Sequence, residues 1–189
     1  MIFGVDTSGK INQLPMWVGV VKPKRRGILE ELKKSVARRK PVISARRRLN
    51  GRYLNQGEIE KLVENTSFSV GLLRAPVYAS CLRNFRSLHD PKVRVLASVI
   101  FLTLKDLPIR EEDVILVDKD YDYDKMRFLC SSIGFLLRKF EGKNLDVEVG
   151  TSYNESIGLA DIVAKLGRLG KLQASEMNPN SLEKYMSAF

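Results

Sequence analysis

Two aspartates of this sequence stand directly after short apolar runs. Asp6 follows residues 2–5 (IFGV), and Asp118 follows residues 114–117 (VILV). Such runs, bounded by turn-forming residues, are typical of buried strands, and open α/β sheets bind ligands beyond the carboxyl ends of their strands. Two carboxylates at that edge repel each other and stay ionised only beside a cation or hydrogen-bond donors. The pattern favours a hard ion, Mg²⁺ or Mn²⁺, although aspartates that merely turn the chain after a strand would look the same.

A third aspartate, Asp161, lies in a segment of helical composition that runs from about residue 156 to residue 172. Asp161 falls away from the centre of the apolar stripe of this segment, which comprises Leu159, Ile162, Val163, Leu166 and Leu169. An exposed helix face would carry lysine and glutamate, but the neighbours of Asp161 on this side are Ile157, Gly158, Ala160 and Ala164. Small residues let a helix approach a sheet closely, so we expect this helix to bring Asp161 to the same ion.

The motifs around the three acids resemble the RNase H-like superfamily. They read, in chain order, GVDTSG, VILVDKD and SIGLADIVAKLGR. The DxSG near the N-terminus together with GLADIVA near the C-terminus is similar to a prokaryotic and phage family of unknown function built on that fold. The resemblance implies an α/β fold, an RNase H-like mixed β-sheet flanked by helices, and a metal-dependent nuclease that hydrolyses phosphodiester bonds. Its catalytic and metal-binding residues would be Asp6, Asp118 and Asp161, with Asp6 bridging two ions roughly 4 Å apart.

The sequence departs from the family pattern at the fourth metal ligand. RNase H enzymes usually add a glutamate from a helix after the hairpin sheet, for which this chain offers Glu58, Glu60 and Glu64. The related family often has an acid directly after the first aspartate, where this chain has Thr7. We therefore predict that Glu155, just before the third-acid helix, is a metal ligand, with Asp120 as the alternative. If no fourth acid reaches the site, an inactive RNase H-fold module for nucleic-acid binding or protein interaction becomes the alternative function.

Basic residues are concentrated in one segment. Residues 22–52 contain thirteen Lys or Arg against two Glu, whereas the formal charge of the whole chain is +10. Such a segment is typical of a surface that binds nucleic acid, because each cation placed on a phosphate releases a counterion. A solvated basic face without a ligand is the alternative, and the segment lacks the large apolar residues that would insert into a membrane. We predict nucleic-acid contacts, RNA or DNA, from Arg25, Arg26, Arg38, Arg39, Arg46, Arg47 and Arg48.

Hydrophobic periodicity predicts the elements that must position the acids. A hairpin of residues 2–5 and 16–21 is followed by helices over 27–40 and 57–64 and a strand over 67–73. Two helices then span 78–104, with Asp90 as the N-cap of the second, before a strand at 114–117, a helix at 124–140 and a strand at 145–149. The helix over 156–172 and a short helix after Pro179 complete the chain. This order predicts a mixed sheet in one domain of residues 1–189, with a basic insertion or arm at about 22–52.

The composition also bears on the compartment. The longest apolar stretch, residues 95–104, is about half of the roughly 20 residues that a membrane-spanning helix needs. The first residues, MIFGVDTSGK, lack the basic and apolar regions of a secretory signal, and the two cysteines, Cys81 and Cys130, have no metal-ligand spacing. We therefore expect a cytoplasmic protein with reduced thiols and no membrane partner. The sequence leaves the oligomeric state open.

Overall fold

The computed structural model describes residues 1–9, 14–40, 49–151 and 153–189. Within them, six strands form one mixed sheet in the order β5-β4-β1-β2-β3-β6. The antiparallel part is β1 (Ile2–Ser8), β2 (Met16–Pro23) and β3 (Thr66–Leu73). On the other side of β1 the parallel strands β4 (Val114–Asp118) and β5 (Asp146–Gly150) follow, and the short β6 (Ser175–Glu176) pairs in parallel with β3. The predicted fold class, an RNase H-like mixed sheet flanked by helices, is confirmed.

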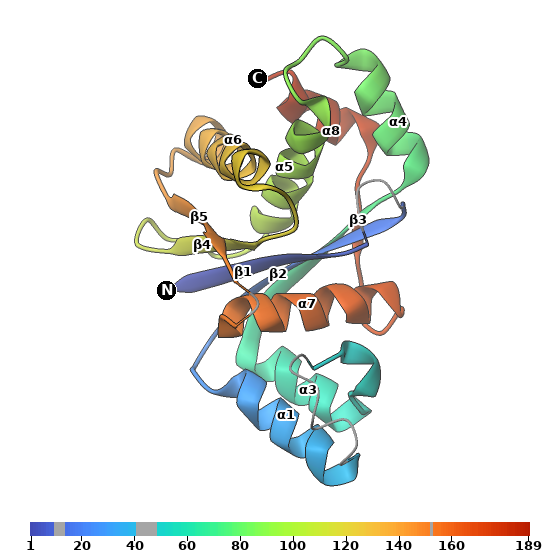
Figure 1. The fold of residues 1–189 in the computed structure, drawn as a ribbon, viewed down its shortest axis with the longest axis vertical. Coiled ribbons are helices and arrows are strands. Elements are labelled where there is room, and N and C mark those ends of the chain that lie inside the picture. Colours follow the sequence, from blue (N-terminus) through green and yellow to red (C-terminus); the bar gives the residue numbers. More distant parts are fainter. Residues whose placement is uncertain (10–13, 41–48, 152) are drawn as a thin grey trace.

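Helices cover both faces of the sheet (Figure 1). One face carries α4 (Ala75–Asn84), α5 (Pro91–Leu104), α6 (Tyr123–Glu141) and α8 (Pro179–Met186). The other face carries α7 (Glu155–Arg168), and behind it lie α1 (Ile28–Arg39), the 3-10 turn η1 (Gly51–Tyr53) and α3 (Gln56–Asn65). The buried apolar side chains accordingly form two clusters, one between the sheet and α5 and α6 and the other among α7, α1 and α3. None of the helices within the described residues has the length and hydropathy to cross a membrane.

The predicted helix cap at Asp90 is confirmed, whereas the predicted end of the last long helix is wrong. Asp90 caps α5, because its Oδ1 accepts a hydrogen bond from the Val93 N–H at 3.3 Å. The helix predicted to continue to Leu172 ends at Arg168 instead. Gly170 takes a left-handed φ of 69°, and the Lys171 N–H turns back to the Leu166 carbonyl at 2.9 Å. The glycine stops the helix by a reversal of the chain that the apolar periodicity did not reveal.

Helix α7 lies unusually close to the two central strands. A Cβ atom added to Gly4 of β1 would lie 2.1 Å from the Ser156 backbone, and one added to Gly19 of β2 would lie 2.4 Å from the Ala160 carbonyl oxygen. The predicted close approach through small helix residues is therefore real, and it depends equally on glycines in the strands. This contact sets the height of Asp161 above the sheet.

The basic segment is built into the fold wherever the structure describes it. Its residues form the end of β2, helix α1 and the turn η1. Arg46, Arg47 and Arg48 lie outside the described residues. The described part is therefore a folded helical layer, not a detached arm.

Candidate metal centre

Asp6 and Asp118 lie next to each other on two neighbouring parallel strands, Asp118 as the last residue of β4 and Asp6 two residues before the end of β1. Val5 pairs with Val117 in the register of β1 and β4, so the residues that follow them are adjacent. Both valines belong to the apolar cluster beneath α5 and α6, and side chains alternate along a strand, so the two aspartates face α7. Asp6 is 5% and Asp118 7% exposed. Two buried carboxylates thus share one edge of the sheet, as the sequence predicted.

Asp120 joins this pair from the loop after β4. One carboxylate oxygen from each of Asp6, Asp118 and Asp120 lies within 4.8 Å of the others, and Asp120 is the exposed member of the three. The Asp120 N–H donates to the Asp118 carbonyl at 3.0 Å, and Asp120 Oδ2 accepts a hydrogen bond from Thr7 Oγ1 at 2.8 Å. Thr7 thus holds the loop against β1. The three aspartates form a group that could hold a metal ion.

The electrostatics of Asp6 fit a cation site. The pKa of Asp6 is raised to about 9, first by burial and then by the negative charges of Asp161, Asp118 and Asp120. The Thr7 N–H, 2.6 Å from Asp6 Oδ1, lowers the pKa but does not outweigh them. A carboxyl group in this setting ionises at neutral pH only beside a cation. An all-oxygen set of ligands suits Mg²⁺ or Mn²⁺.

Asp161 reaches the neighbourhood of this group but is held by a lysine. Its charge is the first cause of the raised Asp6 pKa after burial, so the two carboxylates are near each other. Yet both oxygens of Asp161 lie 2.6 Å from Lys165 Nζ, one turn later on α7. Among the described residues, Asp161 is not part of the group within 4.8 Å. We did not predict the role of Lys165, although its spacing of four residues from Asp161 is typical of a helical ion pair.

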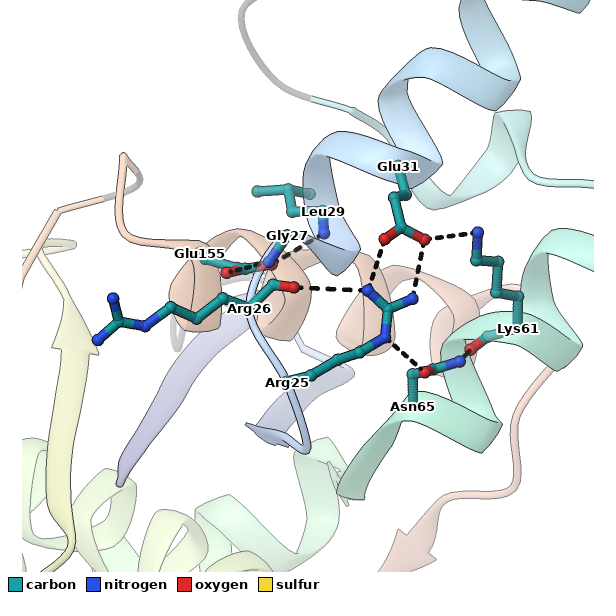
Figure 2. A network of polar contacts seen from close by, with 8 residues as sticks. All are labelled: Arg25, Arg26, Gly27, Leu29, Glu31, Lys61, Asn65 and Glu155. Atoms are coloured by element: carbon teal, nitrogen blue, oxygen red, sulfur yellow. Dashed lines mark hydrogen bonds and ion pairs between the residues drawn. The ribbon is translucent and has the colours of Figure 1, made fainter.

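Glu155 has a different role from the predicted metal ligand. Its Oε2 accepts the Gly27 N–H at 3.0 Å, and its Oε1 accepts the Leu29 N–H at 3.1 Å (Figure 2). Gly27 begins α1 without a side chain that could cap the helix, so Glu155 supplies the acceptors for the free N–H groups of the first turn. Both carboxylate oxygens are used at that helix end, away from the three aspartates.

The glutamates of α3 do not supply the fourth ligand either. Helix α3 lies behind α7, separated by it from the sheet (Figure 1). Glu58 accepts hydrogen bonds from the Asn55 N–H, Ser35 Oγ and Arg39, and Glu60 accepts one from Gln56. Burial raises the pKa of Glu58, but these hydrogen bonds outweigh it and hold the pKa below its usual value. Asp120 is therefore the additional acid that the described structure brings to Asp6 and Asp118.

The predicted nucleic-acid contacts divide into paired and unpaired cations. Arg25 binds Glu31 through both guanidinium NH₂ groups and Asn65 through Nε (Figure 2), and Arg39 binds Glu58 at 2.6 Å. Lys22 is buried and lies 2.7 Å from Asp113. Within the part of the chain that the structure describes, Arg26 and Arg38 are exposed without an acidic partner, and the Arg26 guanidinium points away from the network in Figure 2. Several basic residues that the sequence suggested for phosphate binding are therefore already paired with acidic side chains in the folded protein.

Comparison with known proteins does not extend these observations. No protein-family model matches the chain, and no curated protein matches it. A relationship to RNase H-like proteins therefore stays a prediction from the three motifs, with which the fold is consistent.

Proposed function

We propose that this protein is a nuclease that uses Mg²⁺ or Mn²⁺ to hydrolyse phosphodiester bonds of RNA or DNA. The observation that supports it is the convergence of Asp6 of β1, Asp118 at the end of β4 and Asp120 after it within 4.8 Å. The sheet edge where they meet is where α/β folds place ligands. Burial of two of the three makes a bound cation the natural compensation for their repulsion.

Each aspartate has a separate task in this proposal. Asp6, which is near both Asp118 and Asp161, would contact both ions of a two-metal site. Asp118 and Asp120 would complete one ion's ligands, and Asp161 would serve the other ion once Lys165 releases it. Bound ions of this kind lower the pKa of the attacking water and stabilise the leaving oxygen. Thr7 keeps the Asp120 loop in position through its hydrogen bond.

The charge of the protein supports a polyanionic substrate. The chain carries a formal charge of +10. Arg26 and Arg38, near opposite ends of α1, are exposed cations of the helical layer, and neither has an acidic partner among the described residues. Phosphate groups would provide such partners.

The testing experiment is cleavage of labelled single-stranded RNA, single-stranded DNA, RNA:DNA hybrid and a four-way junction, with Mg²⁺, Mn²⁺ or EDTA. We expect EDTA-sensitive cleavage by the wild type that falls about a hundredfold or more in Asp6→Asn and Asp118→Asn. Asp106→Asn is the matched control, since Asp106 is an exposed aspartate at the end of α5, and it should cut like the wild type.

Binding without cleavage by the wild type would overturn this proposal. It would favour the second candidate, an inactive RNase H-fold module for nucleic-acid binding or protein interaction. The ion pair between Asp161 and Lys165 is the observation that favours this candidate, because a lysine there already supplies a positive charge.

A further inference from the structure

Helix α6 and the edge strand β5 leave a groove between them. The groove has a volume of about 440 Å³. Val147 points toward α6, because its Cγ2 is 3.8 Å from the position that a Cβ atom of Gly134 would take. Val149 lies on the same face of the strand and is 37% exposed. The absence of a side chain at Gly134 keeps the middle of the groove open.

Aromatic and cationic side chains alternate along the helical wall of this groove. Tyr123, Arg127, Phe135 and Arg138 all line it, at spacings that place them on one side of α6. Tyr123 is 68% exposed, which is unusual for a large ring in a water-facing position. Phe135 is 39% exposed, and its ring stacks on that of Phe189 with 5.5 Å between the centroids. From Tyr123 to Arg138 the wall is about 22 Å long, at the helical rise of about 1.5 Å per residue.

The charges along the groove favour a polyanion. Arg127 is exposed and has no acidic partner among the described residues, and Arg138 donates only to Asn144 Oδ1, at 2.9 Å. Asp146 is the acidic residue of the lining, so the two arginines leave an excess of positive charge. The charged side chains of Asp146 and Glu148 on β5 also disfavour the addition of a peptide strand to this edge.

The groove begins beside the three aspartates. Tyr123 is the third residue after Asp120, so their Cα atoms are at most about 11 Å apart. The intervening Tyr121 lines the small cavity that also contains Asp6, Asp118 and Asp120. The groove therefore ends at the same end of the sheet as the candidate metal centre, whose Asp6 and Asp118 side chains face α7 on the other side of the sheet.

We infer that the α6–β5 groove binds single-stranded nucleic acid, an inference that rests on the proposed function and narrows its substrate. Exposed rings stack on bases of any sequence, whereas the bases of a duplex are already stacked on one another and do not offer their faces. Arg127 and Arg138 bind the phosphates between the stacked bases. The groove thus selects an unpaired strand and leads it to the end of the sheet where the aspartates lie.

The test is fluorescence anisotropy in EDTA, where no cleavage occurs, with ten-nucleotide oligothymidylate, ten-nucleotide oligouridylate and a ten-base-pair duplex. The wild type should bind the single strands more tightly than the duplex. Arg127→Glu and Tyr123→Ala should each weaken single-strand binding about tenfold, a loss typical of one phosphate or one stacked base. Tyr123→Phe, which keeps the ring, should retain the affinity.

Arg83→Glu is the matched control, because Arg83 is an exposed arginine of α4 outside the groove and its replacement changes the charge equally. Unchanged binding in the groove variants, or the same loss in Arg83→Glu, would overturn the inference; so would tighter binding of the duplex. Thermal unfolding of each variant checks that it is folded. If metal-dependent cleavage is observed but the groove variants bind like the wild type, only the inference about the groove is wrong. If the groove variants lose binding but the wild type does not cleave, only the proposed nuclease function is wrong.

Discussion

Lys165 Nζ lies 2.6 Å from both carboxylate oxygens of Asp161, one helical turn away on α7. The ammonium group stands where a second metal ion would need the same oxygens. The pair is mostly buried, with 10% of the Asp161 side chain and 29% of the Lys165 side chain exposed. Lysine and metal ion are therefore expected to compete for Asp161.

Replacement of this lysine tests the competition. Lys165→Met should cost about 1–3 kcal/mol of metal-free stability, because it removes hydrogen bonds to a charged group and leaves Asp161 unpaired near Asp6. Mg²⁺ should then raise the melting temperature of the variant more than that of the wild type. Lys105→Met, at an exposed lysine after α5, is the control and should respond to Mg²⁺ like the wild type. Equal responses in all three proteins would show that Lys165 does not compete with the ion.

Metal binding should depend on pH through Asp6. Burial, followed by the neighbouring carboxylates, raises the pKa of Asp6 from 3.8 to about 9, so the folded metal-free protein holds a proton that the unfolded chain releases near pH 4. This contribution makes metal-free stability fall as the pH rises from about 4 to about 9. A bound ion must displace the proton, so Mg²⁺ affinity should rise over the upper part of this range. Calorimetry at pH 7 in buffers of different ionisation enthalpy should detect close to one proton released by the wild type and less by Asp6→Asn; equal release would contradict the assignment.

The cations of the basic segment should separate into structural and binding residues. Lys22 lies 2.7 Å from the buried carboxylate of Asp113, and Lys22→Met should cost about 1–3 kcal/mol by removing this hydrogen bond between charged groups. The Met1 amino group, 3.1 Å from the other Asp113 oxygen, would remain as a partner. Burial raises the pKa of Asp113, but the hydrogen bonds from Lys22 and the Arg110 N–H outweigh it and lower the pKa below its usual value.

Arg38→Glu should instead leave stability nearly unchanged, weaken nucleic-acid binding and reduce its salt dependence. Urea unfolding and salt titrations of binding measure the two effects, and the reverse pattern would refute the division.

The close approach of α7 should make Gly19 intolerant of any side chain. A methyl group there would lie 2.4 Å from the Ala160 carbonyl oxygen and 2.8 Å from the Ala164 nitrogen. Because backbone atoms cannot yield as a flexible side chain can, Gly19→Ala should cost about 3 kcal/mol, at the upper end of overpacking. It should also weaken Mg²⁺ binding by moving Asp161.

Gly57 provides the matched control for this substitution. It lies in the first turn of α3, and a Cβ atom there would meet nothing closer than Asn55 Oδ1 at 3.8 Å. Gly57→Ala should therefore stabilise the protein by about 0.4–1 kcal/mol. Denaturant unfolding of both variants compares them, and a Gly19→Ala protein as stable as the wild type would contradict the packing argument.

The amino-acid sequence by itself determined the elements and the two central acids. Each strand and α-helix within the described residues except the two-residue β6 was predicted, and the 3-10 turn η1 was not. The predictions came from apolar periodicity and capping residues, because these signals are local. The side-by-side positions of Asp6 and Asp118 followed from their apolar runs, although β1 continues through Asp6 to Ser8 while β4 ends at Asp118. The charge excess of residues 22–52 was equally visible.

Only the tertiary structure decided which other side chains meet these two acids. Asp120 joins them because its loop folds back onto β1 through Thr7, whereas Glu155 turns to the free N–H groups of α1. Lys22, Arg25 and Arg39 are neutralised by acids that lie 91, 6 and 19 residues away in the sequence. Such choices depend on contacts between distant segments, and the energy of a charge depends on its burial and neighbours, neither of which a local pattern contains.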